Sequence, residues 1–183
     1  MRDTPFPTAQ TQAYAPLAKM LHWALAVLIT GMTGLGWFMM SIEDDPGSEW
    51  YFNLHKSIGA VIVALVLLRV LWRLTHTPTP LPTSIASWQV MASKVGHGLL
   101  YIAMLAMPFF GIVGTLFSDD ETLLFGVALP RLVTANHDLA ETFFEAHSIT
   151  AWVFVALIAV HALAGLKHLV KDKDGVFQRM WFS

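Results

Sequence analysis

Four long apolar runs separated by polar segments dominate the hydrophobic pattern of this chain. They cover about residues 17–42, 52–74, 90–117 and 139–170. Each run reaches the roughly 20 residues that a helix needs to cross the hydrocarbon of a bilayer. The apolar residues are continuous rather than alternating, which favours helices over the strands of a membrane barrel. The pattern predicts an all-α membrane protein, an antiparallel bundle of four transmembrane helices.

The overall composition supports one membrane domain over residues 1–183. Of the 183 residues, 55% are hydrophobic and 13% are charged, whereas soluble domains have about 25% charged residues. A net charge of −2 argues against a nucleic-acid partner, which needs a concentrated basic surface. The chain has no cysteine, so disulfides, iron–sulfur clusters and covalently attached haem are excluded.

Proline and glycine residues indicate where helices are interrupted or bent and where a neighbour can approach a helix closely. The segment 75–82 contains three prolines and predicts a loop between the second and third helices. Pro108 is expected to bend the third helix. Gly111 and Gly114 leave room there for a neighbouring helix or a flat ligand.

The loop charges predict an orientation in the membrane. The segments 41–51 and 118–138 each contain four acidic residues. Arg131 is the single arginine or lysine in the two segments together. The opposite helix ends carry the basic residues Arg2, Lys19, Arg69, Arg73, Lys94, Lys167, Lys171, Lys173 and Arg179. The positive-inside rule therefore places both termini in the cytoplasm and the two acidic loops outside.

Histidines within the apolar runs are the candidate chemistry, because an ionisable group in hydrocarbon is costly. His147 and His161 are fourteen residues apart on the fourth run. That spacing puts them on one helix face about 21 Å apart. His22 lies near the start of the first run and His55 near the start of the second. His22 is therefore expected to face His161 on the cytoplasmic side, and His55 to face His147 on the outer side.

Facing imidazoles at two depths are what two stacked b-type haems need, with His22, His55, His147 and His161 as axial ligands. Two axial histidines leave no position for oxygen, so electron transfer is the expected use. Zinc would need four convergent ligands, which pairs so far apart do not offer. Hydrogen-bonded core histidines are the simpler alternative, and the matched depths of all four argue against it.

Other polar residues have several open roles. His97 and His168 are candidates to replace a ligand, to contact a haem propionate or a quinone, or to lie at the interface. Arg73, like the other basic residues of the cytoplasmic half, is a candidate for the same contacts or only a consequence of the positive-inside bias. His76 and His137 are expected to be solvated, and His137 is also a candidate contact for an outer substrate.

Lys56, beside His55, and Arg131 are the basic residues of the outer half. Topology gives no reason for a cation there, so both are candidates for contact with a propionate or an anionic substrate.

The chain resembles the bacterial cytochrome b561 family, which is itself similar to the haem-b subunits of nickel hydrogenases. The resemblance runs from about Tyr14 to Met180. It rests on the ordered segments Leu21-His22-Trp23, Leu54-His55-Lys56-Ser57-Ile58-Gly59, Arg69-Val70-Leu71-Trp72-Arg73, Gly96-His97-Gly98-Leu99-Leu100-Tyr101, Phe125-Gly126, Ala146-His147, Val160-His161-Ala162-Leu163, Leu166-Lys167-His168, Lys171-Asp172-Lys173-Asp174 and Arg179-Met180.

The resemblance implies an oxidoreductase of the bacterial inner membrane with two bis-histidine b haems, again on His22, His55, His147 and His161. It further implies oxidation of superoxide at the periplasmic face and electron delivery to ubiquinone. Superoxide is an anion and the outer loops are acidic, so Lys56 and Arg131 would have to steer it locally. The alternative is an electron-transfer subunit that serves a periplasmic or membrane partner, and the oligomeric state is left open.

Overall fold

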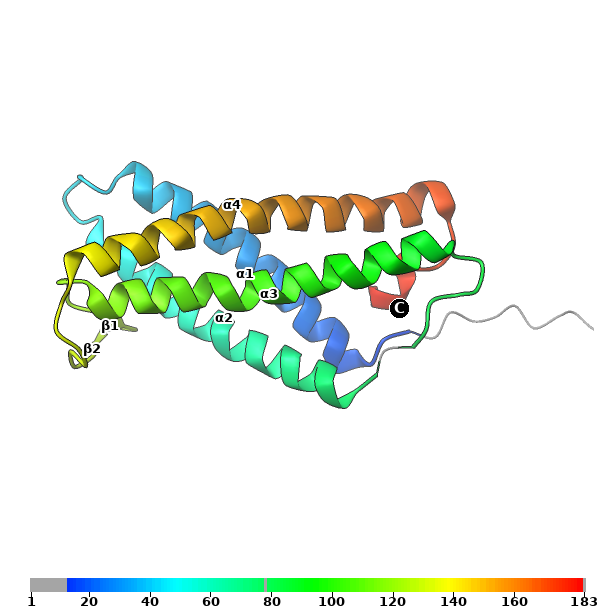
Figure 1. Ribbon diagram of the computed structural model, residues 1–183, viewed down its shortest axis with the longest axis horizontal. Coiled ribbons are helices and arrows are strands. Elements are labelled where there is room, and N and C mark those ends of the chain that lie inside the picture. The colour runs from blue at the N-terminus through cyan, green and yellow to red at the C-terminus, as the bar shows by residue number, and fades with distance from the viewer. Residues whose placement is uncertain (1–12, 78, 183) are drawn as a thin grey trace, which may run out of the picture.

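The computed structural model describes residues 13–77 and 79–182; the others, Arg2 among them, lie outside this description. Within the described residues, four long helices lie side by side (Figure 1). All four are long and apolar enough to cross a membrane, which confirms the predicted four-helix membrane bundle. They are α1 (Pro16–Ser41), α2 (Glu49–Thr75), α3 (Ser87–Phe117) and α4 (His137–Lys167).

The helix bounds differ slightly from the apolar runs. Helices α2 and α3 each begin three residues before the run that predicts them, because polar residues of a first helical turn do not register as apolar. Helix α4 begins where the Asn136 side chain accepts a hydrogen bond from the Leu139 amide, at 3.1 Å, an N-cap. It ends at Lys167 rather than 170 and continues as a π-helical turn, η1 (His168–Asp172).

The long segment between α3 and α4 forms a small hairpin. Strands β1 (Leu123–Leu124) and β2 (Val127–Ala128) pair antiparallel. Phe125 and Gly126 make the turn, both with positive φ. The main-chain N–H of Asn136 donates a 2.9 Å hydrogen bond to the Phe117 carbonyl, which joins the two ends of the segment. We call this end of the bundle the hairpin end, and the opposite end, with the 76–86 segment, the linker end (Figure 1).

The core lies between the two ends. Leu25, Ile29 and Met32 of α1 contact buried residues of the other helices, namely Ile62, Val66, Ala103 and Phe154. Phe154 lies seven residues from His147 and seven from His161. The apolar core therefore separates the two histidines of α4.

Large apolar side chains are exposed along all four helices. The most hydrophobic window of each helix is mostly unburied within the protein. In water such a surface would be unfavourable, so it is the surface that faces lipid.

The C-terminal segment covers the linker end. It contains a single 3-10 turn, η2 (Phe177–Met180), and its carbonyls accept hydrogen bonds from α1. Trp23 Nε1 donates to the Met180 carbonyl at 2.9 Å, and Lys19 Nζ donates to the Trp181 carbonyl at 2.7 Å. The chain end is thereby attached beside His22.

Candidate functional site

Two pairs of imidazole rings face each other inside the bundle, one pair near each end. At the hairpin end, the ring centres of His55 and His147 are 6.1 Å apart with an interplanar angle of 77°. At the linker end, His22 and His161 are 6.0 Å apart at 76°. These are the two pairs expected from the fourteen-residue spacing on α4. Their role as haem ligands stays a prediction.

The ring separations are suitable for a shared metal ion. Two metal–nitrogen bonds of about 2 Å, plus roughly 1 Å from each nitrogen to its ring centre, would place two imidazoles that share one metal ion about 6 Å apart. The steep interplanar angle is no obstacle, because each metal bond lies in the plane of its own ring. Both pairs therefore fit the spacing of bis-histidine coordination.

His147 is held in a defined orientation by α3. Its Nδ1 lies 2.8 Å from the Met107 carbonyl, which can only accept, so Nδ1 carries the proton. That tautomer leaves Nε2 free to bind a metal. The ring also lies against Gly111, where a Cβ atom would come within 3.0 Å of Nδ1. The close approach expected at Gly111 is thus to the imidazole itself.

His55 is in similarly close contact with α1. A Cβ atom on Gly36 would lie 3.5 Å from its ring. Among the described residues, no partner bonds to its buried Nδ1 atom. A buried polar atom without a partner is costly, and this one belongs to a ring that faces a second imidazole.

The linker-end pair has a cation beside it. Nη2 of Arg69 lies 3.3 Å from Nδ1 of His22. Nη1 of the same guanidinium donates a 3.3 Å hydrogen bond to the Ala18 carbonyl. A guanidinium only donates, so this contact puts the His22 proton on Nε2. Metal binding through Nε2 would move the proton to Nδ1, and Arg69 would then need another acceptor.

A third imidazole also contacts His161. The ring centre of His97 lies 5.4 Å from that of His161, and its Nδ1 lies 3.3 Å from Ser93 Oγ. From the sequence, it stayed open whether His97 takes the place of one of the four predicted haem ligands. Both His22 and His97 lie near enough to pair with His161. Trp23 packs edge-on against His22 at 5.3 Å, and this contact was not anticipated.

A cavity of about 260 Å³ opens at the linker end beside these rings. Arg69, Arg73, His97 and Tyr101 line it together with apolar groups. His76, expected to be solvated, lines its edge and stacks on Trp72 with ring centres 3.6 Å apart. The cavity combines cations, hydrogen-bond donors and apolar walls, which suits an amphiphilic or anionic ligand.

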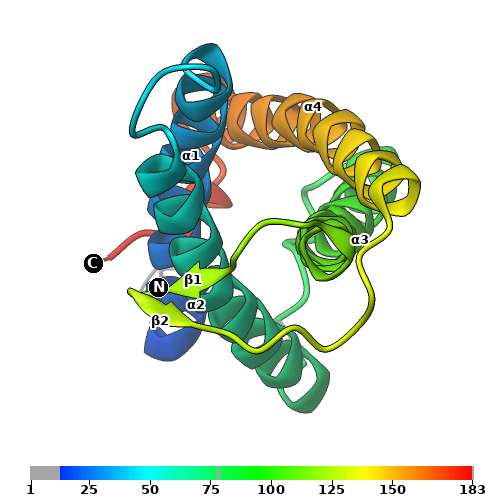
Figure 2. The same cartoon turned by 90° about the vertical axis from the view of Figure 1, so that its left-hand side faces the viewer.

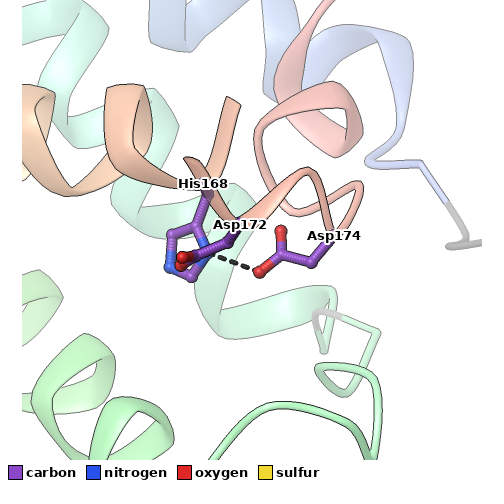
Figure 3. Close-up of side chains that lie close together, drawn as sticks. All are labelled: His168, Asp172 and Asp174. Atoms are coloured by element: carbon purple, nitrogen blue, oxygen red, sulfur yellow. Dashed lines mark hydrogen bonds and ion pairs between the residues drawn. The ribbon is translucent and has the colours of Figure 1, made fainter. Parts of the chain in front are cut away.

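His168 lies outside this cavity, in a cluster with two carboxylates (Figure 3). Its Nδ1 is 2.6 Å from Asp174 Oδ2 and 3.4 Å from Asp172 Oδ2. The ligand atoms lie within 4.8 Å of one another, a spacing that a metal ion could use. Lys167 already pairs with Asp172, so the cluster is compensated without an ion.

The two cations of the hairpin end differ in their surroundings. Arg131 bonds to the carbonyls of Ser118 and Asp119 at 3.0 and 2.6 Å and pairs with the Asp119 carboxylate. It therefore stabilises its own loop. Lys56 is partly buried and makes no hydrogen bond or ion pair among the described residues, although Asp120 interacts with it electrostatically. His137 is exposed and lies 3.9 Å from Glu141.

One spacing relates two residues on each helix that lie around the imidazole pairs. Each helix places one residue at each level, fourteen positions apart: His22 and Gly36, His55 and Arg69, His97 and Gly111, His147 and His161. From the sequence, the spacing was recognised on α4 alone. Because fourteen residues are nearly four helical turns, the same interval on the other helices was the signal for Arg69 and Gly36.

A bundle of four membrane helices with a pair of facing imidazoles near each end has an architecture suited to a membrane cytochrome. The family model for prokaryotic cytochrome b561 matches residues 13–183, and the chain belongs to that family. The family binds haem b and carries electrons, so the protein is a multi-pass bacterial membrane cytochrome.

Curated relatives are similar over nearly their whole length. The chain is 30% identical over 178 residues to "Cytochrome b561 homolog 2" of Escherichia coli K12, covering 94% of this chain and 93% of that protein. It is 29% identical over 170 residues to "Probable superoxide oxidase CybB" of Yersinia pestis, covering 91% and 94%. A second E. coli relative, "Cytochrome b561 homolog 1", is 27% identical over 179 residues, covering 94% and 95%.

Proposed function

We propose that this cytochrome binds two haem b groups and carries single electrons across the bacterial inner membrane. His55 and His147 would hold one group, and His22 and His161 the other. Bound haem would supply a one-electron redox centre, and with two histidine ligands it would transfer electrons rather than bind oxygen. The observation that carries the proposal is the pair of imidazole separations of 6.1 and 6.0 Å, each of the length that a shared metal requires.

The charge distribution supports an orientation. Described basic residues concentrate at the linker end, whereas the hairpin-end loops hold Glu43, Asp44, Asp45, Glu49, Asp119, Asp120 and Glu121. By the positive-inside rule, the linker end and both termini face the cytoplasm and the hairpin end faces the periplasm.

The proposed reaction oxidises superoxide at the periplasmic face and reduces ubiquinone. Each superoxide loses one electron to become dioxygen; two electrons and two protons convert one ubiquinone to ubiquinol. The name of the Yersinia relative supports superoxide as the donor. Lys56, which makes no hydrogen bond or ion pair among the described residues, is the cation available to attract the anion there. Arg131 is a weaker candidate because Asp119 pairs with it.

The cavity at the linker end is the proposed quinone site. Arg73 and His97 line it and can donate hydrogen bonds to quinone carbonyls. His168 is not part of the lining. Its contacts to Asp172 and Asp174 favour a structural role in the turn that follows α4.

Absorption spectra of the purified protein, before and after dithionite, test the cofactor assignment. A sharp low-spin b-type α band and about two haems per chain are expected. His55→Ala and His22→Ala should each remove one haem, whereas His137→Ala, an exposed histidine of the hairpin end, should remove none. A colourless protein after haem-supplemented expression would overturn the proposal.

Stopped-flow mixing with superoxide tests the reaction. Haem reduction should follow the superoxide pulse faster than spontaneous dismutation consumes it. If no reduction exceeds that control while the haem content is two per chain, the cytochrome is instead an electron-transfer subunit for a dedicated partner.

A further inference from the structure

The hairpin between α3 and α4 carries an unusual uncharged stretch. Residues 122–130 contain no charged side chain, whereas Asp119, Asp120 and Glu121 precede them and Arg131 follows. At the turn, Phe125 is 68% exposed and Val127 is 65% exposed. Exposed apolar side chains bounded by charges mark a surface that meets another apolar phase.

The two strands of the hairpin lie next to α2 (Figure 2), and β1 contacts that helix. The Leu123 amide donates to Asn53 Oδ1 at 3.4 Å, and the Phe125 amide donates to Ser57 Oγ at 2.9 Å. Ser57 lies eight residues into α2, which begins at Glu49, so the turn is about 12 Å along the helix axis from that end. This is the level of His55.

The hairpin covers a face of α2 that becomes lipid-facing further along. Val61 and Leu68 follow Ser57 at helical intervals that keep them on nearly the same face. Ser57 is 4% exposed beneath the hairpin, whereas Val61 and Leu68 are both open at the protein surface. The hairpin is therefore continuous with the surface that contacts acyl chains.

The backbone of the hairpin is suited to an apolar environment. A non-helical segment at membrane depth needs partners for its polar groups. The β1–β2 pairing, the two anchors on α2 and a 2.9 Å bond from the Leu129 amide to the Thr122 carbonyl supply them. The Ser57 hydroxyl meanwhile donates to the Asn53 carbonyl at 2.7 Å, so the anchor itself is satisfied.

We infer that the hairpin is an interfacial membrane loop, with Phe125 and Val127 inserted into the lipid at the edge of the bilayer beside α2. The uncharged stretch, its depth and its continuity with the exposed face of α2 carry this inference. The inference does not require that haem be bound.

Site-directed spin labelling tests it cleanly, because the chain has no native cysteine. Phe125→Cys, Val127→Cys and the control Asp119→Cys would each carry one nitroxide in the full-length protein, reconstituted in phosphatidylcholine and phosphatidylglycerol vesicles. Labels at 125 and 127 should collide readily with oxygen, which is concentrated in lipid. Their collision rate with a water-soluble nickel chelate should be severalfold lower than that of the label at 119.

Two outcomes would overturn the inference. Nickel accessibility at 125 and 127 equal to that at 119 would place the turn in water. Protection of both positions from oxygen and nickel together would place it against protein, such as a second copy of the chain.

A second pair of variants keeps the test independent of the label positions. With the label at Val127, Phe125→Asp should raise nickel accessibility severalfold, whereas Phe125→Leu should leave it unchanged. The helical circular dichroism and the haem content report whether the bundle is intact. An unchanged nickel accessibility in Phe125→Asp with an intact bundle would contradict insertion, and a loss of haem alone would affect only the proposed function.

Discussion

Nδ1 of His147 donates a 2.8 Å hydrogen bond to the main-chain carbonyl of Met107. This single contact fixes both the tautomer and the direction of the ring. It joins α4 to α3 one residue before Pro108 and one turn before Gly111. A carbonyl partner strengthens the electron donation of a metal-bound imidazole, so the contact bears on the chemistry as well as on the geometry.

Gly111→Ala should remove the haem of the hairpin end. The new Cβ atom would lie 3.0 Å from Nδ1 and 3.1 Å from Cε1 of His147, and the ring would have to leave its position opposite His55. Pyridine haemochrome assay should give about one haem per chain instead of two. Gly98→Ala is the matched control on α3, because nothing lies within 4 Å of its Cβ position. Two haems in both variants would show that the ring does not need this approach.

The contacts of His161 predict different results for its two neighbours. His22→Ala should remove the linker-end haem, because His22 is the assigned ligand. His97→Ala should keep two haems and shift the spectrum or potential of one, since the ring packs beside His161 at 5.4 Å. Loss of a haem in His97→Ala, with two retained in His22→Ala, would reassign the ligand to His97.

Arg69→Gln should lower the reduction potential of the linker-end haem. A cation near the centre favours its reduced form, which carries one positive charge less, and the low dielectric of the bundle strengthens the effect. A tenfold change in the reduction equilibrium, about 59 mV for one electron, is expected in a potentiometric titration. Lys94→Gln, which removes an exposed cation of the same end, should change the reduction potential of neither haem. Equal shifts in both variants would indicate a general charge effect.

Lys56→Glu should slow the reduction of the oxidised protein by superoxide. The substitution replaces the available cation of the hairpin end with an anion, so the attraction at short range becomes repulsion. The deficit should shrink as ionic strength rises, because salt screens both interactions. Arg131→Gln should have a smaller effect, since Asp119 already pairs with Arg131. A rate independent of both charge and salt would exclude local steering.

Much of the fold and of the site could be predicted from the sequence because membrane helices obey simple rules. Continuous apolar runs gave the four helices, and the fourteen-residue interval on α4 gave the two levels and their pairs. The same interval on α1, α2 and α3 was overlooked, because glycine and arginine do not attract attention as ligands. The starts of α2 and α3 lie three residues before the apolar runs, because hydropathy measures the apolar run rather than the first helical turn.

The amino-acid sequence by itself determined the four spans, the family and the depth of each histidine, because these depend on local hydropathy and on the regular rise of a helix. Only the tertiary structure decided which side chain meets which. The Met107 carbonyl, the contact of Arg69 with His22, the position of His97 beside His161 and the return of the hairpin to Ser57 depend on the rotation and packing of helices distant in sequence. No local pattern specifies that rotation, because it results from how all four helices bury their small and apolar faces together.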